Sequence, residues 1–265
     1  MNWRTLLTLA ALGAMACSGG GGGDEDTEGT DGSADDDGDG LSNAEEEELG
    51  LDPSSDDSDD DGYSDFDEVD AGSDPLDAGS VIYEGGWPYS AAKADLDPAD
   101  VAEVATQGEL FTNFKGYDQY GQEVELWDYM NDEDKYIIID ISAEWCGPCQ
   151  AVALWLDGGT DYYNLEPEFG AVREAVDNGD AYWITVLAED SYGVPSNQAA
   201  VDRWFASFSH PNVPVLTDGD YEMVGYCELT AFPYLIVLKP DMTVSWKGGR
   251  FASWDKALTH VMKKL

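Results

Sequence analysis

Residues 136–150 decide the fold of this chain, and they read Tyr-Ile-Ile-Ile-Asp-Ile-Ser-Ala-Glu-Trp-Cys-Gly-Pro-Cys-Gln. The apolar run at the start predicts a strand buried on both faces. Cys146 and Cys149 follow at the exit of this strand, and their spacing indicates a dithiol redox site. Residues 150–156 are expected to form a helix. Cys146 would then lie at a helix N-terminus, where unpaired N–H groups and the helix dipole favour a thiolate.

The composition divides the chain into two parts. It has 265 residues, enough for one good core and a smaller unit, and 56 acidic against 12 basic residues give a net charge of −44. This charge argues against nucleic acid as a partner and against adsorption to anionic lipid. Between Asp24 and Asp77 there are 25 acidic residues and no basic one, whereas most aromatic residues follow Tyr83. Only the later part can build a large core.

The N-terminus predicts export. Arg4 precedes a short apolar run over residues 6–14, which is too short to span a bilayer, and small residues then lead to Cys17. Residues 1–16 therefore read as a signal peptide. The end of this segment resembles the lipobox of bacterial lipoproteins, although Ala14 stands where leucine is usual. The resemblance implies a lipid anchor on Cys17, with residues 17–34 as a tether. An ordinary secretory signal is the alternative.

Two acidic loops follow, and the second repeats the first after 22 residues. In each loop, residues with oxygen ligands occupy positions 1, 3, 5, 9 and 12, and glycine occupies position 6. Carboxylates at this spacing converge, and glycine permits the sharp turn of a calcium loop. A backbone carbonyl at position 7 completes the two predicted ligand sets, which are Asp35, Asp37, Asp39, Leu41, Asn43 and Glu46, and Asp57, Asp59, Asp61, Tyr63, Asp65 and Glu68.

These loops resemble the thrombospondin type 3 calcium repeats of secreted bacterial proteins. The resemblance covers residues 35–77 and implies a calcium-binding segment over residues 35–80, with a linker over 81–104. No strong helices flank the loops, so a full EF-hand pair is not expected. The alternative is a disordered acidic linker whose charges are merely solvated. With calcium, the segment would become a short stiff stalk.

Residues 105–265 predict one α/β domain. An N-terminal hairpin is expected over 108–126, with strands at 110–114 and 123–126 and a helical turn at 127–131. Later strands are expected at 182–188, 213–216, 234–238 and 243–247. Helices are expected at 167–178, at 196–207 with Ser196 as N-cap, and at 251–265. This order implies a mixed central sheet with helices on both faces.

The segment 136–150 resembles thioredoxin, and the hairpin points to the extracytoplasmic redoxin or TlpA-like branch. Three further positions support the resemblance. Asp140 stands six residues before Cys146, Phe232-Pro233 comes directly before the strand at Tyr234, and two glycines, 248 and 249, precede the last helix. The resemblance covers roughly residues 105–265. It implies a thioredoxin-like fold and thiol-disulfide oxidoreductase activity.

The resemblance also implies a role for each site residue. Cys146 is the attacking thiolate and Cys149 the resolving thiol. Asp140, desolvated on its strand, has a raised pKa and exchanges a proton with Cys149. Pro233 is expected in a cis peptide bond, which presents the backbone before it to a substrate strand. Trp145 shapes the opening of the site.

Some residues depart from the thioredoxin pattern. Gln150 stands where lysine or arginine is usual, and the strand at 182–188 has no lysine to partner Asp140. Both changes remove positive charge, so the Cys146 thiol is expected to be less acidic than in thioredoxin. Cys227 is read as a buried core thiol, with a third redox thiol as the alternative.

Other functions compete with this interpretation. A redoxin-type peroxidase would carry threonine three residues before the nucleophile, where this chain has Ala143. A closed zinc site lacks a second cysteine pair, and copper-chaperone relatives space their cysteines more widely. A calcium-stiffened surface module with little redox activity is the last alternative.

The favoured interpretation is a lipid-anchored thiol-disulfide oxidoreductase of the cell envelope. Its expected partners are disulfide-containing exported proteins, an unidentified electron donor and the membrane. No catalytic cofactor is expected.

Overall fold

The computed structural model describes residues 33–248 and 254–265. The predicted signal peptide, Cys17 and Gly249 lie outside these residues. The chain divides into two compact units, with the division between Ile82 and Tyr83. Within the described residues, no helix has both the length and the apolar character needed to cross a membrane.

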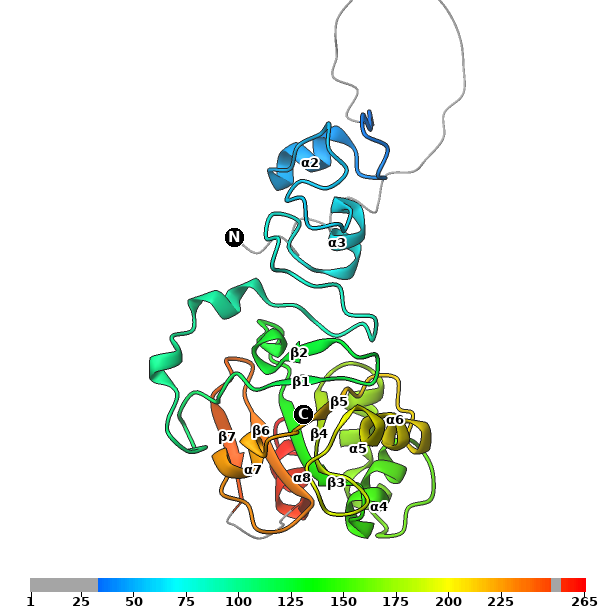
Figure 1. The fold of residues 1–265 in the computed structure, drawn as a ribbon, viewed down its shortest axis with the longest axis vertical. Helices are drawn as coiled ribbons and strands as arrows, with labels where there is room; N and C mark the ends of the chain where they lie inside the picture. The colour runs from blue at the N-terminus through cyan, green and yellow to red at the C-terminus, as the bar shows by residue number, and fades with distance from the viewer. Residues whose placement is uncertain (1–32, 249–253) are drawn as a thin grey trace, which may run out of the picture. The chain divides into compact units, whose positions relative to one another are not determined.

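The first unit consists of the two acidic loops, each followed by a helix of seven residues: α2 (Asn43–Leu49) and α3 (Asp65–Ala71) (Figure 1). Ser42 and Ser64 cap the helix N-termini by accepting backbone N–H groups, and a left-handed glycine ends each helix. The sequence analysis did not predict these helices. Their apolar core is small, because its buried members are Leu41, Leu51 and Val69.

The second unit is built on a mixed five-stranded sheet in the order β5-β4-β3-β6-β7 (Figure 1). Strands β3, β4 and β5 are parallel, and β6 and β7 are antiparallel to their neighbours. The strands are β3 (Ile137–Ala143), β4 (Tyr182–Glu189), β5 (Val215–Thr217), β6 (Tyr234–Leu238) and β7 (Val244–Lys247). All seven residues of β3 are buried. This confirms the strand predicted from the apolar run.

Four helices cover one face of the sheet: α4 (Gly147–Leu156), α5 (Glu166–Asp177), α6 (Gln198–Ser207) and α8 (Trp254–Val261). Successive parallel strands step in one direction from β3 to β5. Because such crossovers are right-handed, the helices that join these strands lie on the same face. Buried side chains of α4, α5 and α8 pack with Ile138, Trp183 and Val237. Those of α6 pack with Leu187 and Val215.

The N-terminal hairpin covers part of the other face, and its first strand differs from the prediction. The strands are β1 (Lys115–Tyr117) and β2 (Glu123–Glu125), so the strand predicted at 110–114 is wrong. Residues 110–114 do not form a strand of this hairpin, and the side chains of Phe111 and Phe114 in this segment are buried. Gly116 lies against β5, where an added Cβ would be 2.7 Å from the carbonyl oxygen of Thr217. A residue without a side chain is required there.

Two further elements differ from the sequence analysis. The N-cap of α6 is Asn197, whereas the hydroxyl of Ser196 accepts the backbone N–H of Asp218. A short helix, α7 (Glu222–Tyr226), occupies a region read as loop. The ring of Tyr226 packs edge-to-face on Phe111, with ring centroids 5.2 Å apart, so α7 lies beside the segment that leads into the hairpin.

The segment predicted as a linker over 81–104 is packed from Tyr83 onward. It contains the 3-10 helices η1 (Ala91–Asp95) and η2 (Pro98–Asp100), and a third, η3 (Leu126–Tyr129), follows β2. The Tyr83 hydroxyl donates to Asp128 at 2.7 Å, and Lys93 donates to the same carboxylate at 2.6 Å. Aromatic side chains and buried carboxylates therefore join this segment to the second unit. The strand order and the site at the end of β3 give this unit a thioredoxin-like fold.

Candidate redox site and acidic loops

The cysteine pair lies between the end of β3 and the start of α4. Cys146 and Cys149 form a disulfide with an S–S distance of 2.06 Å. Cys146 is the N-cap of α4, and its Sγ accepts the backbone N–H of Cys149 at 3.2 Å. This confirms the predicted position at a helix N-terminus. In the reduced protein, the same N–H group and the helix dipole would stabilise a Cys146 thiolate.

The surroundings of the disulfide are apolar. Both cysteines are buried, whereas Gly147 and Pro148 between them are exposed. Trp145 is 52% exposed beside the pair, and its ring contacts Phe232 edge-to-face with ring centroids 6.1 Å apart. Two aromatic rings therefore lie beside the disulfide.

Phe232 introduces the cis peptide bond. The Phe232–Pro233 bond is cis, as predicted, and it lies directly before β6. β6 pairs with β3 over five residues, from Ile137 to Ile141, so the two strands bring Pro233 and the cysteine pair to the same end of the sheet.

Asp140 lies inside the sheet. It is 1% exposed, and its Oδ1 accepts the hydroxyl hydrogen of Ser142 at 2.9 Å. Burial raises the pKa of this carboxyl to about 7, against smaller lowering effects of Ser142 and Trp183. Among the described residues, Oδ2 of Asp140 and the indole N–H of Trp183 have no hydrogen-bond partner of normal geometry. Asp140 is thus a buried group that can take up a proton near neutral pH.

Asp140 and α4 share a face of the sheet. Side chains alternate along a strand, so Asp140 points to the same face as Ile138. Ile138 packs in one cluster with Val152 and Trp155 of α4. Cys149 stands one helical turn before Val152 and therefore also faces this side of the sheet. This arrangement places the buried carboxyl on the face of the sheet that α4 covers, and the resolving cysteine faces the sheet from that helix.

Glu189 was missed by the sequence analysis. The Trp145 indole N–H donates to its Oε2 at 2.6 Å, and the Tyr221 hydroxyl donates to its Oε1 at 3.4 Å. Glu189 is the last residue of β4, and parallel neighbours end at the same edge of a sheet. An acidic residue at the end of the strand after the cysteine pair was the available signal.

A surface groove of about 590 Å³ runs beside Trp145. Arg203 lies in it, but Nε and Nη2 of its guanidinium both donate at 2.7 Å to the carboxylate of Glu144. Gln150 donates to the carbonyl of Glu144 at 2.6 Å. The groove thus supplies no unpaired cation to the cysteines. It is lined by Glu144, Trp145, Gln150, Ser191, Arg203, Trp204, Ala206, Ser207 and Phe208.

Cys227 is a free, buried thiol at the end of α7. Burial raises its pKa to about 12, which keeps the thiol protonated and unreactive. This supports its interpretation as a core residue.

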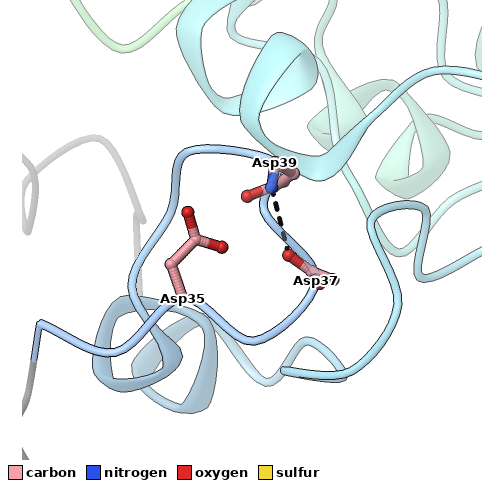
Figure 2. Close-up of side chains that lie close together, drawn as sticks. All are labelled: Asp35, Asp37 and Asp39. Carbon is pink, nitrogen blue, oxygen red and sulfur yellow. Dashed lines mark hydrogen bonds between the residues drawn. The ribbon is translucent and has the colours of Figure 1, made fainter.

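The acidic loops gather their carboxylates as the spacing predicted. Asp35, Asp37 and Asp39 have ligand oxygens within 4.8 Å of one another, and Figure 2 shows these three side chains around the turn of the first loop. The backbone N–H of Asp39 donates to Asp37 at 3.2 Å (Figure 2). In the second loop, Asp57, Asp59 and Asp61 cluster in the same way. Gly40 and Gly62 at position 6 have φ of 116° and 101°, which favour glycine.

The position-12 glutamates, Glu46 and Glu68, are fully buried. Neither oxygen of Glu46 has a hydrogen-bond partner among the described residues, and Oε2 of Glu68 has none. Burial, with repulsion from the acidic groups at Asp37 and Asp39, raises the pKa of Glu46 to about 7. Orphaned buried carboxylate oxygens beside a carboxylate cluster fit a hard cation such as calcium.

The position-9 residues, Asn43 and Asp65, form hydrogen bonds within their loops. Oδ1 of Asn43 accepts the N–H of Asp36 at 3.0 Å, and Oδ1 of Asp65 accepts the N–H of Ser58 at 2.9 Å. Each side chain therefore closes its own loop. The structure places Leu41 and Tyr63 at the turn of their loops, each donating its N–H to the preceding aspartate at position 5.

A model of the bacterial TSP3 repeat matches residues 35–55 and 57–78. These repeats are calcium-binding, and their match agrees with the predicted resemblance. A comparison with curated protein sequences found no match.

Solved structures similar to this chain include several thioredoxin-like proteins. The exposed lipoprotein thioredoxin Etrx1 of Streptococcus pneumoniae is 21% identical, with a TM-score of 0.40, over 58% of this chain and 100% of that one. The thioredoxin domain of a thiol-disulfide oxidoreductase from Bacteroides vulgatus is 19% identical, with a TM-score of 0.42, over 60% of this chain and 98% of that one. A putative thiol:disulfide interchange protein DsbE from Chlorobium tepidum is 16% identical, with a TM-score of 0.44, over 61% of this chain and 99% of that one.

Proposed function

We propose that this protein is an extracytoplasmic thiol-disulfide oxidoreductase that reduces or exchanges protein disulfides through Cys146 and Cys149. The observation that carries the proposal is the disulfide at the N-terminus of α4, where Sγ of Cys146 accepts the N–H of Cys149. A thiolate at this position is stabilised by the helix terminus and is the nucleophile of disulfide exchange.

The reaction begins with the reduced pair. The Cys146 thiolate attacks one sulfur of a substrate disulfide, a mixed disulfide forms, and the other substrate sulfur leaves as a thiolate that takes up a proton. Cys149 then loses its proton and attacks Sγ of Cys146. This closes the Cys146–Cys149 disulfide and releases the second substrate thiol. Two electrons pass from the protein to the substrate, and an electron donor must return them for the next cycle.

Asp140 is the proposed proton acceptor for Cys149. Its pKa of about 7 lets the carboxyl take up and return a proton at neutral pH. Cys149 faces the sheet from α4 on the side where Asp140 lies, and Oδ2 of Asp140 has no hydrogen-bond partner of normal geometry within the described chain. The charged form of Asp140 is therefore available to accept a proton.

The cis bond at Pro233 supports substrate pairing. Phe232 precedes β6 at the same end of the sheet as the cysteines, and its ring contacts Trp145. We assign the backbone at Phe232 to pair with an extended substrate segment during the mixed disulfide. Trp145 shapes this opening.

The substrates are disulfide-containing exported proteins. The export signal predicted over residues 1–16 supports a place in the cell envelope, with a lipid on Cys17 as the anchor and residues 17–34 as the tether. Disulfides persist in such oxidising compartments.

Calcium is the proposed ligand of residues 35–80. When bound, it would supply positive charge to the buried carboxylates. In the first loop, Asp35, Asp37, Asp39 and Glu46 would hold it with the Leu41 carbonyl. The second loop would use Asp57, Asp59, Asp61 and Glu68 with the Tyr63 carbonyl, and Asn43 and Asp65 support the loops from position 9. Each side chain would then have the opposite charge that its burial requires.

The reduction of insulin disulfides by dithiothreitol tests the redox proposal. The wild type is expected to accelerate the precipitation of the insulin B chain, and Cys146→Ser to lose this effect. Ser54→Ala, an exposed substitution in the first unit, serves as a control that keeps the wild-type rate. Equal rates for the wild type and Cys146→Ser would overturn the proposal.

A further inference from the structure

The two acidic loops differ at their position-12 glutamates. Glu46 and Glu68 are both fully buried. Both oxygens of Glu46 lack a hydrogen-bond partner in the described part of the chain. Oε1 of Glu68, in contrast, accepts the hydroxyl hydrogens of Ser73 at 3.1 Å and Ser80 at 2.8 Å. A carboxylate oxygen has two lone pairs, so two hydroxyl donors saturate Oε1.

The cause of this difference is visible in the repeat that follows each glutamate. Ser58 and Ser80 stand twelve residues after Glu46 and Glu68. Each accepts a backbone N–H from the aspartate of an Asp-Pro turn: Asp52 for Ser58 at 3.0 Å, and Asp74 for Ser80 at 3.1 Å. Because each oxygen accepts that bond, each hydroxyl hydrogen is free to point elsewhere.

The hydroxyl groups of Ser58 and Ser80 donate to different acceptors. Ser58 donates to Oδ2 of Asp65, seven residues further on, at 2.7 Å. The residue seven places after Ser80 is Trp87, which has no carboxylate. Ser80 therefore donates back to Glu68. The array of acidic loops ends after the second loop. Ser80, which stands where a third loop would begin, therefore bonds to the glutamate of the second loop, Glu68.

We propose that the two loops bind calcium unequally, with Glu46 as a bidentate ligand of a tighter site and Glu68 as a monodentate ligand of a weaker one. A bidentate glutamate at position 12 is the usual arrangement of calcium loops. Glu68 has only Oε2 to offer unless the serine hydroxyls are displaced. The inference rests on the proposed calcium function and adds the residues that set the order of binding.

Ser73 is the cleaner of the two residues to change. The hydrogen bond of its hydroxyl within the described chain goes to Glu68, whereas Ser80 also supports the turn at Asp74. The corresponding residue of the first repeat is Leu51, which offers no donor to Glu46. Removing the Ser73 hydroxyl is thus expected to free one lone pair of Oε1 without disturbing the backbone.

Calorimetric titration of the full chain with calcium chloride, after removal of calcium by a chelator, tests the proposal. The wild type is expected to show two binding events whose dissociation constants differ by roughly tenfold. A tenfold ratio corresponds to the free energy of about one hydrogen bond to a charged group. Asp37→Asn should remove the tighter event and Asp59→Asn the weaker one. Ser73→Ala should strengthen the weaker event and leave the tighter one unchanged.

Ser80→Ala is a second variant with the same expected direction, and Ser54→Ala is the control, because its hydroxyl bonds to Asp52 and to neither glutamate. Far-ultraviolet circular dichroism confirms that each variant is folded. The inequality would be overturned if the wild type showed two equal events or if Asp59→Asn lost the tighter event. It would also be overturned if the weaker event were unchanged in both Ser73→Ala and Ser80→Ala. The absence of any binding in the wild type up to about 10 mM calcium would instead overturn the calcium function itself.

Discussion

The indole N–H of Trp145 donates a hydrogen bond of 2.6 Å to Oε2 of Glu189, and this bond joins the residue before the cysteine pair to the end of β4. Trp145 is half exposed, so packing alone does not fix its ring. The bond to a carboxylate holds the ring against Phe232, at the opening through which a substrate must approach.

Glu189→Ala is therefore expected to lower kcat/KM for insulin reduction, by no more than about tenfold, because a hydrogen bond to a charged group is lost at a partly exposed position. Glu189→Gln keeps an acceptor for the indole and should retain most of the activity. Steady-state kinetics of both variants measure the effect. If Glu189→Ala had wild-type kinetics, the assignment of Glu189 as a positioning residue would be wrong.

Asp140 should lower the free energy of unfolding of the oxidised protein increasingly as the pH rises to neutral and alkaline values. The pKa of this carboxyl is about 7 in the folded protein and 3.8 as its ordinary value. The folded state therefore binds more protons between these values, and its stability falls as pH rises from about 4 to 7. Above pH 7 the full cost is present, about 4 kcal/mol as an upper estimate from 1.36 kcal/mol per pKa unit.

Asp140→Asn removes this cost. Its free energy of unfolding in urea, compared with that of the wild type, is expected to be higher by up to about 4 kcal/mol at pH 8 and by less than about 1 kcal/mol at pH 4. A gain that does not depend on pH would contradict the account of a buried titrating carboxyl. The same variant should slow the release of substrate from the mixed disulfide, because Cys149 loses its proton acceptor.

Cys227 should stay unreactive in the native protein. Its pKa of about 12 leaves almost no thiolate at pH 8, and the side chain is 2% exposed. After reduction and brief treatment with iodoacetamide, peptide mass spectrometry should find the label on Cys146 and not on Cys227. Cys227→Ala should keep the activity and cost about 1 kcal/mol in stability. Fast labelling of Cys227, together with loss of activity in Cys227→Ala, would instead identify a third redox thiol.

Calcium removal should loosen the first unit and leave the redox reaction unchanged. This unit buries Glu46, Asp65 and Glu68 over a core of three buried apolar residues, so it needs a cation more than the second unit does. At calcium concentrations of about ten times the dissociation constant, the gain in stability is about 1.4 kcal/mol. Hydrogen exchange of residues 33–82 with calcium and with chelator measures it, with insulin reduction as the control. Equal exchange in both conditions would contradict the prediction.

The sequence was most informative where one residue type has one physical meaning. The apolar run before Cys146 predicted a buried strand, and the spacing of Asp35, Asp37 and Asp39 predicted a tight carboxylate loop. The resemblance to thioredoxin implied the cis bond at Phe232-Pro233. In these places local chemistry and the overall fold agree, so the prediction did not depend on distant contacts.

The sequence was less informative where tertiary contacts decide. Tyr83 and Trp87 looked like part of a linker, but buried carboxylates on later elements, Asp128 and Asp118, hold them. Glu189 gains its function only because β3 and β4 end at the same edge of the sheet. The seven-residue helices α2 and α3 are too short to be stable alone, so their periodicity gave no signal.

The central claim is that Cys146 attacks the substrate and Cys149 resolves the mixed disulfide. Incubation of reduced Cys149→Ser and Cys146→Ser variants with oxidised insulin, followed by acid quenching and mass spectrometry of the intact chain, tests this most directly. Cys149→Ser should accumulate an adduct with insulin on Cys146, because no resolving thiol remains, and Cys146→Ser should form none. Adduct formation through Cys149 in Cys146→Ser, with none on Cys146 in Cys149→Ser, would contradict the account.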